Sequence, residues 1–323
     1  MATITGDFAF TEEEATQMAE KLKNAMDGFG TNEDEIIQVL VTHSSEQRQV
    51  LADKYLAAYG ESLVEDLKSE LSGDLEECVV GLMMRPRYYD AKVLHDAISG
   101  AGTDEKTLIG VMCSRNNEEI EDIKKAYAAL YDGADLTEDL SGDTSGYFKR
   151  LMVSLSTGCR NEEEEDDDKI TEDAQKLIDA GVNQVGTDEC DFNSVLCLKS
   201  EKQLKKVLEK YQELRETDLE DDIASEMSSD LKDGYLAVVK MVKNKYKYFA
   251  ERLNNAMRGF GTDDSELIRL IISRSEEDLL WVAEEYEKLY EVSLFDDVKS
   301  ECSGYYKSLL LSLIVGRFVS KDE

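Results

Sequence analysis

The amino-acid sequence predicts an all-α protein that contains four copies of one helical unit. Three observations carry this prediction: a near-absence of proline, a motif pair that recurs four times, and apolar residues at helical spacing. The chain has 323 residues but only 1 proline, which favours helices because turn-rich β proteins use more proline. Hydrophobic residues make up 41% of the chain and charged residues 33%, which is typical of globular helices with solvated outer faces.

The recurring motif is a glycine turn followed by threonine, with an acidic residue and serine much further along. The last glycine of each turn is Gly30, Gly102, Gly186 and Gly261. The acids of the second motif are Glu70, Asp143, Glu226 and Glu301, which lie 40, 41, 40 and 40 residues after those glycines. Self-similarity of this kind is typical of repeat architectures.

Apolar residues within each unit recur at helical spacing. The gaps between these stripes leave room for about five helices per unit, and no strand-like alternation is sustained. In the fourth unit the stripes are Leu267, Leu270 and Ile271, then Leu279, Val282, Ala283 and Tyr286, then Tyr306, Leu309, Leu310 and Leu313.

The spacing between the second and third units is longer than the others. The additional residues fall around the acidic run 162–168, which we interpret as a solvated linker. It divides the chain into two halves of two units each. The predicted division is an N-terminal tail 1–11, repeats 12–84 and 85–158, an acidic linker 159–169, repeats 170–244 and 245–318, and a C-terminal tail 319–323.

The charge of the chain excludes some partners. It carries 37 basic and 71 acidic residues, a formal net charge of −34. Proteins bind nucleic acid largely through Lys and Arg against phosphate, so we expect no nucleic-acid partner. The same charge repels anionic lipid unless a positive group lies between the two surfaces.

The cysteines and the ends of the chain indicate the compartment. Six cysteines lie far apart without metal-type pairing, and we expect isolated buried thiols in a reducing environment. Residues 1–10 have no basic region followed by an apolar run, and the apolar stretch 309–315 is too short to cross a bilayer. We therefore expect a soluble, cytosolic protein.

The glycine turn and the distant acid have the chemistry of a Ca2+ site. Glycines let successive backbone carbonyls turn inward, and a later carboxylate supplies the charge that such a turn lacks. Ca2+ takes about six to eight oxygen ligands of these kinds. A simpler interpretation stays open for any single copy: the glycines close a helix–helix turn and the threonine caps the next helix. An EF-hand loop is absent from the sequence.

At these residues the sequence resembles the annexin family. The matching pieces are the segments 26–31 and 257–262 with their partner acids, together with the four-unit layout and the longer central linker. The resemblance covers residues 12–318. It implies a curved disc of four repeats, each of five helices, with calcium-bridged loops of the AB and DE type on the convex face. It also implies Ca2+ as the cofactor and an anionic, phosphatidylserine-like membrane as the partner.

By position, the resemblance to the family assigns a set of metal ligands to each repeat of this sequence. The resemblance implies carbonyl ligands from each turn and a carboxylate from the partner acid: Met26, Gly28, Gly30 and Glu70; Ile98, Gly100, Gly102 and Asp143; Gly181, Gln184, Gly186 and Glu226; Met257, Gly259, Gly261 and Glu301.

Several positions depart from the family pattern. The family usually has a basic residue after the first carbonyl ligand, as at Arg258, where the first two units have Asp27 and Ser99. The acid of the second unit lies one residue further on, which we attribute to an added residue near 132–133. In the third unit Ser229 replaces the glycine of Ser-Gly. We expect the fourth and first sites to bind metal most strongly and the third most weakly.

Other features of the turns and helices allow two interpretations. Phe29, Ala101, Val185 and Phe260 beside the turn glycines either enter the headgroup region or fold back onto their own turns. The stripe of Lys240, Lys243 and Lys247 either meets lipid phosphates or pairs with neighbouring acids, and the acid excess favours pairing.

Two other classes of function compete with this prediction. An enzyme is disfavoured because the only histidines, His43 and His95, are isolated, and no nucleophile elbow, phosphate loop or zinc spacing occurs. A helical scaffold that uses Ca2+ only for rigidity is the second rival. The sequence predicts a non-enzymatic, reversible peripheral membrane protein of the cytoplasm. A protein partner of the N-terminal tail, and extracellular exposure without a signal peptide, are compatible with this prediction.

Overall fold

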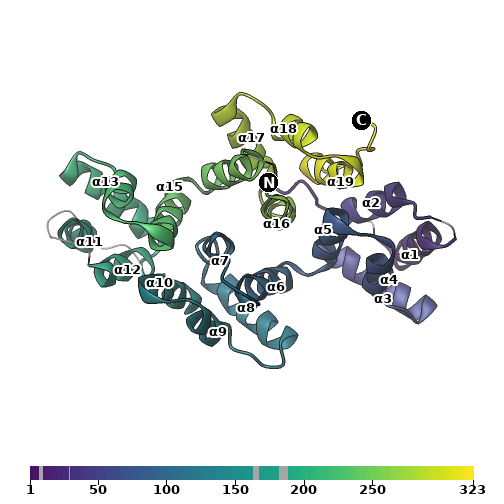
Figure 1. The fold of residues 1–323 in the computed structure, drawn as a ribbon, viewed down its shortest axis with the longest axis horizontal. Helices are drawn as coiled ribbons and strands as arrows, with labels where there is room; N and C mark the ends of the chain where they lie inside the picture. The colour runs from purple at the N-terminus through teal and green to yellow at the C-terminus, as the bar shows by residue number, and fades with distance from the viewer. Residues whose placement is uncertain (7–9, 29, 163–166, 182–187, 260) are drawn as a thin grey trace. The chain divides into compact units, whose positions relative to one another are not determined.

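The computed structural model describes residues 1–6, 10–28, 30–162, 167–181, 188–259 and 261–323 (Figure 1). Within these ranges the regular structure is helical throughout and no strand occurs. The predicted all-α class is confirmed.

The described residues form nineteen helices, and α15 bends at Asn244, where φ is −160° and ψ is 96°. Counting α15 as two segments gives five helical segments for each of the four repeats, as predicted. The helices are α1 (Glu12–Met26), α2 (Glu33–Val41), α3 (Ser45–Tyr59), α4 (Leu63–Glu70), α5 (Gly73–Met83), α6 (Pro86–Ile98), α7 (Glu105–Met112), α8 (Asn117–Leu130), α9 (Leu136–Asp143), α10 (Gly146–Ser156), α11 (Asp167–Ala180), α12 (Glu189–Leu196), α13 (Glu201–Arg215), α14 (Leu219–Glu226), α15 (Ser229–Met257), α16 (Asp264–Ser275), α17 (Leu279–Tyr290), α18 (Leu294–Glu301) and α19 (Gly304–Val315).

The bend in α15 has a local cause in the sequence. The Asn244 side-chain oxygen accepts hydrogen bonds from the backbone N–H groups of Tyr246 and Lys247, each at 3.1 Å. This is the geometry of an N-cap, and asparagine is among the residues that favour it. The third repeat therefore ends, and the fourth begins, at a residue that caps a new helix.

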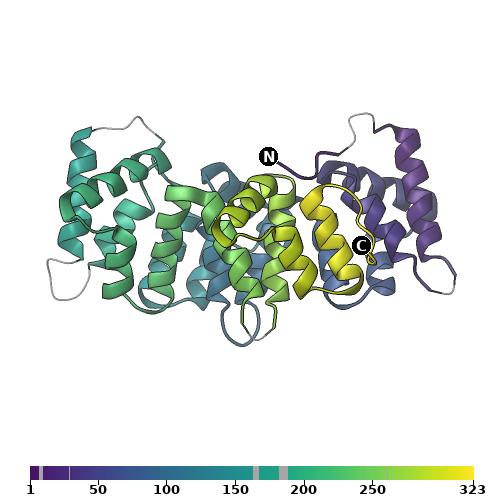
Figure 2. The same cartoon turned by 90° about the horizontal axis from the view of Figure 1, so that it is seen from above.

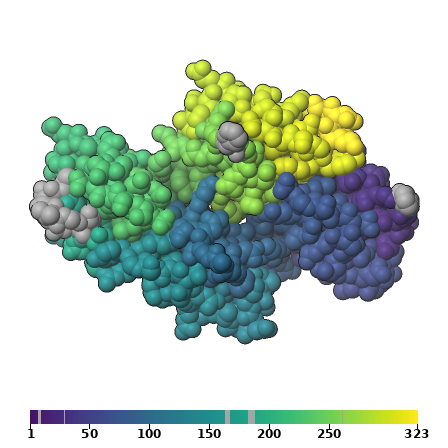
Figure 3. Space-filling model, viewed as in Figure 1, coloured from purple at the N-terminus to yellow at the C-terminus, as the bar shows by residue number. Residues whose placement is uncertain are grey.

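The chain forms two compact units, one of residues 1–86 and 249–323 and the other of residues 87–248. The first and fourth repeats thus form one unit, and the second and third form the other, so the predicted division into consecutive halves is wrong. In the first unit α19 contacts α2 and α5, and α16 contacts α5. The N-terminal and C-terminal helices of this unit lie side by side in Figures 1 and 2, and their surfaces meet in Figure 3. In the first unit, packing between repeats that are distant in the sequence, and not closeness along the chain, determines which repeats associate.

Each repeat is held by a buried tyrosine of its third helix. The four tyrosines are at most 1% exposed, and their hydroxyls donate to an aspartate of the fourth helix. Burial, together with that aspartate, raises the pKa of each tyrosine above its ordinary value. The pairs are Tyr55 and Asp66 at 2.6 Å, Tyr127 and Asp139 at 2.8 Å, Tyr211 and Asp222 at 2.6 Å, and Tyr286 and Asp297 at 2.5 Å.

The second of these pairs locates the added residue of the second repeat. Tyr127 and Asp139 are 12 positions apart, whereas the partners in the other three pairs are 11 apart. The connection between them contains Asp132 and Gly133, both with positive φ, where the other repeats have one such residue. The predicted place of the insertion is confirmed.

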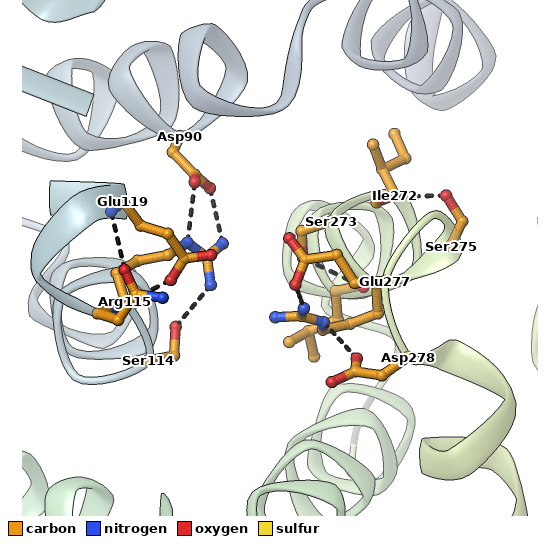
Figure 4. Close-up of polar contacts among 12 residues, drawn as sticks. Asp90, Ser114, Arg115, Glu119, Ile272, Ser273, Ser275, Glu277 and Asp278 are labelled. Carbon is orange, nitrogen blue, oxygen red and sulfur yellow. Dashed lines mark hydrogen bonds and ion pairs between the residues drawn. The ribbon is translucent and has the colours of Figure 1, made fainter. Parts of the chain in front are cut away.

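Buried ion pairs fix the ends of helices within each unit (Figure 4). In the second unit Asp90, 3% exposed, accepts two bonds from Arg115, at 2.9 and 2.8 Å, and one from Arg87. Burial alone would raise the pKa of Asp90, but the two guanidinium groups outweigh it and hold this pKa below its ordinary value. In the first unit Arg274 pairs with Asp278 at 2.7 Å and with Glu277. Removing one partner of such a pair leaves a buried charge and typically costs about 3–5 kcal/mol.

The cysteines differ in part from the prediction. All six lie in the described part of the chain and none pairs in a disulfide. Four are buried, but Cys159 and Cys190 are exposed, so the prediction of buried thiols is wrong for these two. Cys159 follows the end of α10, and Cys190 lies in the first turn of α12, where its sulfur accepts a hydrogen bond from the Arg150 guanidinium at 3.0 Å.

Among the described helices, none combines the length and the apolar character that crossing a bilayer requires.

Candidate metal centres

The glycine turns connect the first and second helices of their repeats. In the first, second and fourth repeats both turn glycines have φ values between 91° and 127°, a region that side chains other than glycine rarely adopt. A Cβ added at any of them would meet nothing within 4 Å, so backbone conformation and not crowding requires glycine. These glycines are Gly28, Gly30, Gly100, Gly102, Gly259 and Gly261.

One backbone hydrogen bond closes the turn in every repeat. The residue after the threonine donates its N–H to the carbonyl of an alanine near the end of the first helix. The bonds join Asn32 to Ala25 at 2.8 Å, Asp104 to Ala97 at 2.8 Å, Asp188 to Ala180 at 2.7 Å, and Asp263 to Ala256 at 2.8 Å. The third pair is eight positions apart and the others seven, so the third turn is longer by one residue.

The third turn is described only at its ends. Gln184 and Gly186, two of its predicted ligands, lie outside the described residues. Gly181 continues the helical pattern, because its N–H donates to the Leu177 carbonyl at 3.1 Å. A Cβ added at Gly181 would lie 3.3 Å from the Leu177 carbonyl oxygen, which is a close contact, and 3.5 Å from the Phe192 ring, which is an ordinary van der Waals distance.

In the three repeats whose turn threonine is described, that threonine does not cap the following helix. The caps are the next residues along the chain, whose side-chain oxygens accept from backbone N–H groups in the first turn of the helix. These caps are Asn32, Asp104, Asp188 and Asp263. The interpretation of the threonine as the cap is wrong, and its hydroxyl is left for another role in the repeats where it is described.

The four recurring acids all stand at the same structural position. Each is the last residue of the fourth helix of its repeat: Glu70 in α4, Asp143 in α9, Glu226 in α14 and Glu301 in α18. The carboxyl end of a helix carries partial negative charge, so a carboxylate there is unfavourable unless a cation is near. The acids are thus placed where binding a cation would relieve repulsion.

The structure brings the turn and the acid together in the first two repeats. The Thr31 hydroxyl donates to a Glu70 carboxylate oxygen at 2.7 Å across 39 positions of sequence. The Thr103 hydroxyl donates to Asp143 at 2.6 Å across 40 positions. In the part of the fourth repeat that the structure describes, Thr262 and Glu301 are not joined by such a bond. The constant spacing between turn and acid predicted that the two meet, but not that the threonine hydroxyl makes the contact.

The bend after each acid requires a left-handed residue. Gly73, Gly146 and Gly304 have φ values of 63°, 60° and 63°. Ser229 occupies the same position in the third repeat with φ 59°, a conformation that is strained for a residue with a side chain.

The donor set fits Ca2+ better than a transition metal. Over the described ranges no group of three or more His, Cys, Asp or Glu side chains could hold a metal ion. A site at these turns would therefore combine one carboxylate with backbone oxygens and water, and hard oxygen ligands of this kind suit Ca2+. The residues present fit such an ion in the first and second repeats.

The residues beside the turns differ between repeats. The Arg258 guanidinium donates to Asp297 at 3.2 Å and to Asn254 at 3.1 Å. Asp27 takes its position in the first repeat and lies 4.0 Å from the Lys23 ammonium. Ala101 is exposed, while Phe29, Val185 and Phe260 lie outside the described residues.

Of the lysine stripe, Lys243 pairs with acids, as the acid excess favoured. Lys243 donates to Asp218 and Glu220 at 2.5 and 2.8 Å. Lys240 and Lys247 also have interaction partners.

Comparison with known proteins supports this architecture. The family model Annexin matches the chain four times, at residues 17–82, 89–155, 172–238 and 248–313. Annexin A11 of Homo sapiens is 46% identical over 299 residues, which are 92% of this chain and 59% of annexin A11. The chain thus spans about three-fifths of the length of that relative.

Solved structures agree. The structure of annexin III superposes on this chain with a TM-score of 0.94 at 38% sequence identity. The match covers 98% of this chain and 97% of the annexin III chain. The structure of calcium-bound annexin (Sm)1 has a TM-score of 0.85 at 29% identity, with 97% of this chain and 93% of its own covered.

The four helical repeats, each with a closed turn between its first two helices and an acid at the end of its fourth, define an all-α, four-repeat class of protein. The chain belongs to the annexin family. Annexins in general bind Ca2+ and phospholipid and are not enzymes.

Proposed function

We propose that this chain binds Ca2+ at its interhelical turns and docks reversibly on anionic phospholipid through the bound ions. The observation that carries the proposal is the contact between turn and acid, Thr31 with Glu70 and Thr103 with Asp143, across about forty positions of sequence. The contact places a carboxylate beside a turn whose glycine conformations allow backbone oxygens to act as metal ligands.

The proposed ligands are backbone carbonyls of each turn together with its acid. The first, second and fourth sites use Met26, Gly28, Gly30 and Glu70; Ile98, Gly100, Gly102 and Asp143; Met257, Gly259, Gly261 and Glu301. In the third repeat Gly181, Gln184, Gly186 and Glu226 form a weaker candidate set, because that turn is longer by one residue.

The membrane step follows from the incomplete shell of such an ion. One carboxylate and a few carbonyls leave coordination positions that lipid phosphoryl or carboxylate oxygens can fill. The chain carries a net charge of −34, but the Debye length is about 8 Å at physiological salt, so distant charges are largely screened. Several weak bridges on one protein then combine by avidity. We propose that the chain is cytoplasmic at low Ca2+ and peripheral on phosphatidylserine-like membranes when Ca2+ rises.

The test is cosedimentation with phosphatidylserine vesicles across a Ca2+ titration. Wild-type protein should pellet with Ca2+ and return to the supernatant on chelation. The double variant Glu70→Gln with Glu301→Gln should need much more Ca2+. The matched control is Glu46→Gln with Glu284→Gln, which removes the same charge from exposed positions of α3 and α17 in the same two repeats.

A chain that pellets equally well in chelator would contradict the proposal. Tight Ca2+ binding in calorimetry, with no gain from vesicles, would instead favour a helical scaffold that uses Ca2+ for rigidity.

A further inference from the structure

We infer that Thr31 and Thr103 are positioning residues for Ca2+: their hydroxyls hold the partner carboxylates at the turns before the ion arrives and so raise affinity. This inference rests on the proposed function and deepens it. It concerns the threonine side chain, which supplies none of the proposed ligands.

The geometry occurs twice, independently, in two different units of the molecule. Thr31 and Glu70 belong to the first unit, and Thr103 and Asp143 to the second. The bonds measure 2.7 and 2.6 Å, within the range for a hydroxyl that donates to a charged carboxylate. The acceptor is a glutamate in the first repeat and the shorter aspartate in the second. The second repeat, which has the shorter acceptor, is also the one with the added residue.

The carboxylate needs such a partner because of where it stands. Glu70 and Asp143 end their helices, where the helix dipole repels negative charge, and the next residues continue in extended conformation. Without a partner at the turn, the acid would be favoured in water, away from the site. Fixing a glutamate side chain in one position costs rotamer entropy, and the threonine hydrogen bond offsets part of that cost before Ca2+ binds.

The bond is compatible with metal coordination. A carboxylate oxygen has two lone-pair directions, so one oxygen can accept from threonine and still face an ion. The hydroxyl is free for this role because the adjacent Asn32 and Asp104 cap the following helices. Outer-shell groups that orient a metal ligand typically change metal affinity by about 10- to 100-fold when they are removed.

The fourth repeat provides an internal control. Thr262 and Glu301 are both described, and no hydrogen bond joins them there. Removing the Thr262 hydroxyl should therefore change Ca2+ affinity less than removing the hydroxyls of Thr31 and Thr103.

The experiment is calorimetric titration of the full chain with CaCl2, without lipid. In the double variant Thr31→Val with Thr103→Val, which keeps side-chain shape, we expect affinity at two sites to fall about tenfold or more. Thr31→Ser with Thr103→Ser retains both hydroxyls and should restore affinity to within about threefold of wild type. Thr262→Val is the matched control, and thermal melting followed by circular dichroism verifies folding.

Each outcome is decisive. If the valine pair binds as wild type does, or if serine fails to restore the affinity, the inference is wrong while the proposed function stands. If wild type itself binds no Ca2+, both are wrong. Should the valine pair not fold, Thr31→Ala with Thr103→Ala removes the same hydroxyls and is judged by the same criteria.

Discussion

The first and third repeats build the same backbone from different residues. At the end of the third helix the first repeat has Gly60 in the left-handed conformation, and the third repeat has Glu216 with φ 58°. After the acid the first repeat has Gly73 and the third has Ser229. Both repeats nevertheless keep the five helical segments and the buried tyrosine. The backbone is thus imposed by packing, and glycine only lowers its conformational cost.

The difference indicates that a repeat can keep the fold without keeping the geometry of the proposed metal site. The first repeat joins its glycine turn to its acid through Thr31, whereas the third repeat has a turn longer by one residue. Four predictions test how far the separation extends, from the largest expected effect to the smallest.

The largest difference should appear when the acid itself is removed. We expect Glu70→Gln to weaken Ca2+ binding at the first turn by about 100-fold or more, because the only charged ligand proposed for that turn is lost. Glu226→Gln should weaken binding by less than about tenfold, because the longer third turn is the weakest of the proposed sites. Calorimetric titration of both variants measures this, and equal losses would show that the two turns are equivalent.

Removing the buried tyrosine hydroxyl should affect both repeats alike. Tyr55→Phe and Tyr211→Phe each delete a hydrogen bond to a carboxylate, which we expect to cost about 2 kcal/mol of unfolding free energy. Chemical denaturation followed by circular dichroism gives the values. A loss in one repeat only would mean that Lys23 or Arg215, the basic neighbours of the two aspartates, compensates unequally.

Exchanging the left-handed residues should move stability in opposite directions. Ser229→Gly relieves a positive φ and should stabilise by about 1 kcal/mol, and Gly73→Ser should destabilise by about the same amount. Thermal melting should show shifts of about 2 °C of opposite sign. Shifts of the same sign would contradict the view that the two positions share one backbone requirement.

The smallest effect concerns the cap of the fourth helix, which is Ser62 in the first repeat and Asp218 in the third. Burial would raise the pKa of Asp218, but hydrogen bonds from Lys243 and from the Glu220 N–H hold it below its ordinary value. A lowered folded pKa stabilises the fold above the unfolded pKa, and this contribution is lost as pH falls through the folded pKa.

Asp218→Ser should therefore destabilise by about 0.5 kcal/mol at neutral pH, and the difference should shrink below about pH 4. Denaturation midpoints at several pH values measure the trend. Asp221→Ser, at an exposed acid of the same helix, is the control. A difference that grows toward acid pH would have the wrong sign for this pairing.

Much of the fold could be predicted because its signals are local. The left-handed glycines mark turns, the helical stripes mark segments, and the spacing from Gly102 to Asp143 revealed an insertion that the structure places at 132–133. The pairing of the first repeat with the fourth could not be predicted in this way. All four repeats carry similar apolar stripes, so spacing along the chain does not determine which stripes pack together.

The site was predictable in its parts but not in its contacts. Thr31 and Asn32 are adjacent and both can cap a helix, so the sequence could not decide which does. The structure assigns the cap to Asn32, and the Thr31 hydroxyl donates to Glu70. The exposure of Cys190 depends on which face of α12 meets its neighbours, and that too is a tertiary property.

The composition of the first unit has a consequence for synthesis. Its two parts, residues 1–86 and 249–323, are separated by the entire second unit. The ribosome therefore releases every residue of the second unit before the first repeat can meet its partner helices. During synthesis the apolar surfaces of α2 and α5 therefore stay uncovered until α16 and α19 have been made. Chaperones would have their longest opportunity to bind at the first repeat.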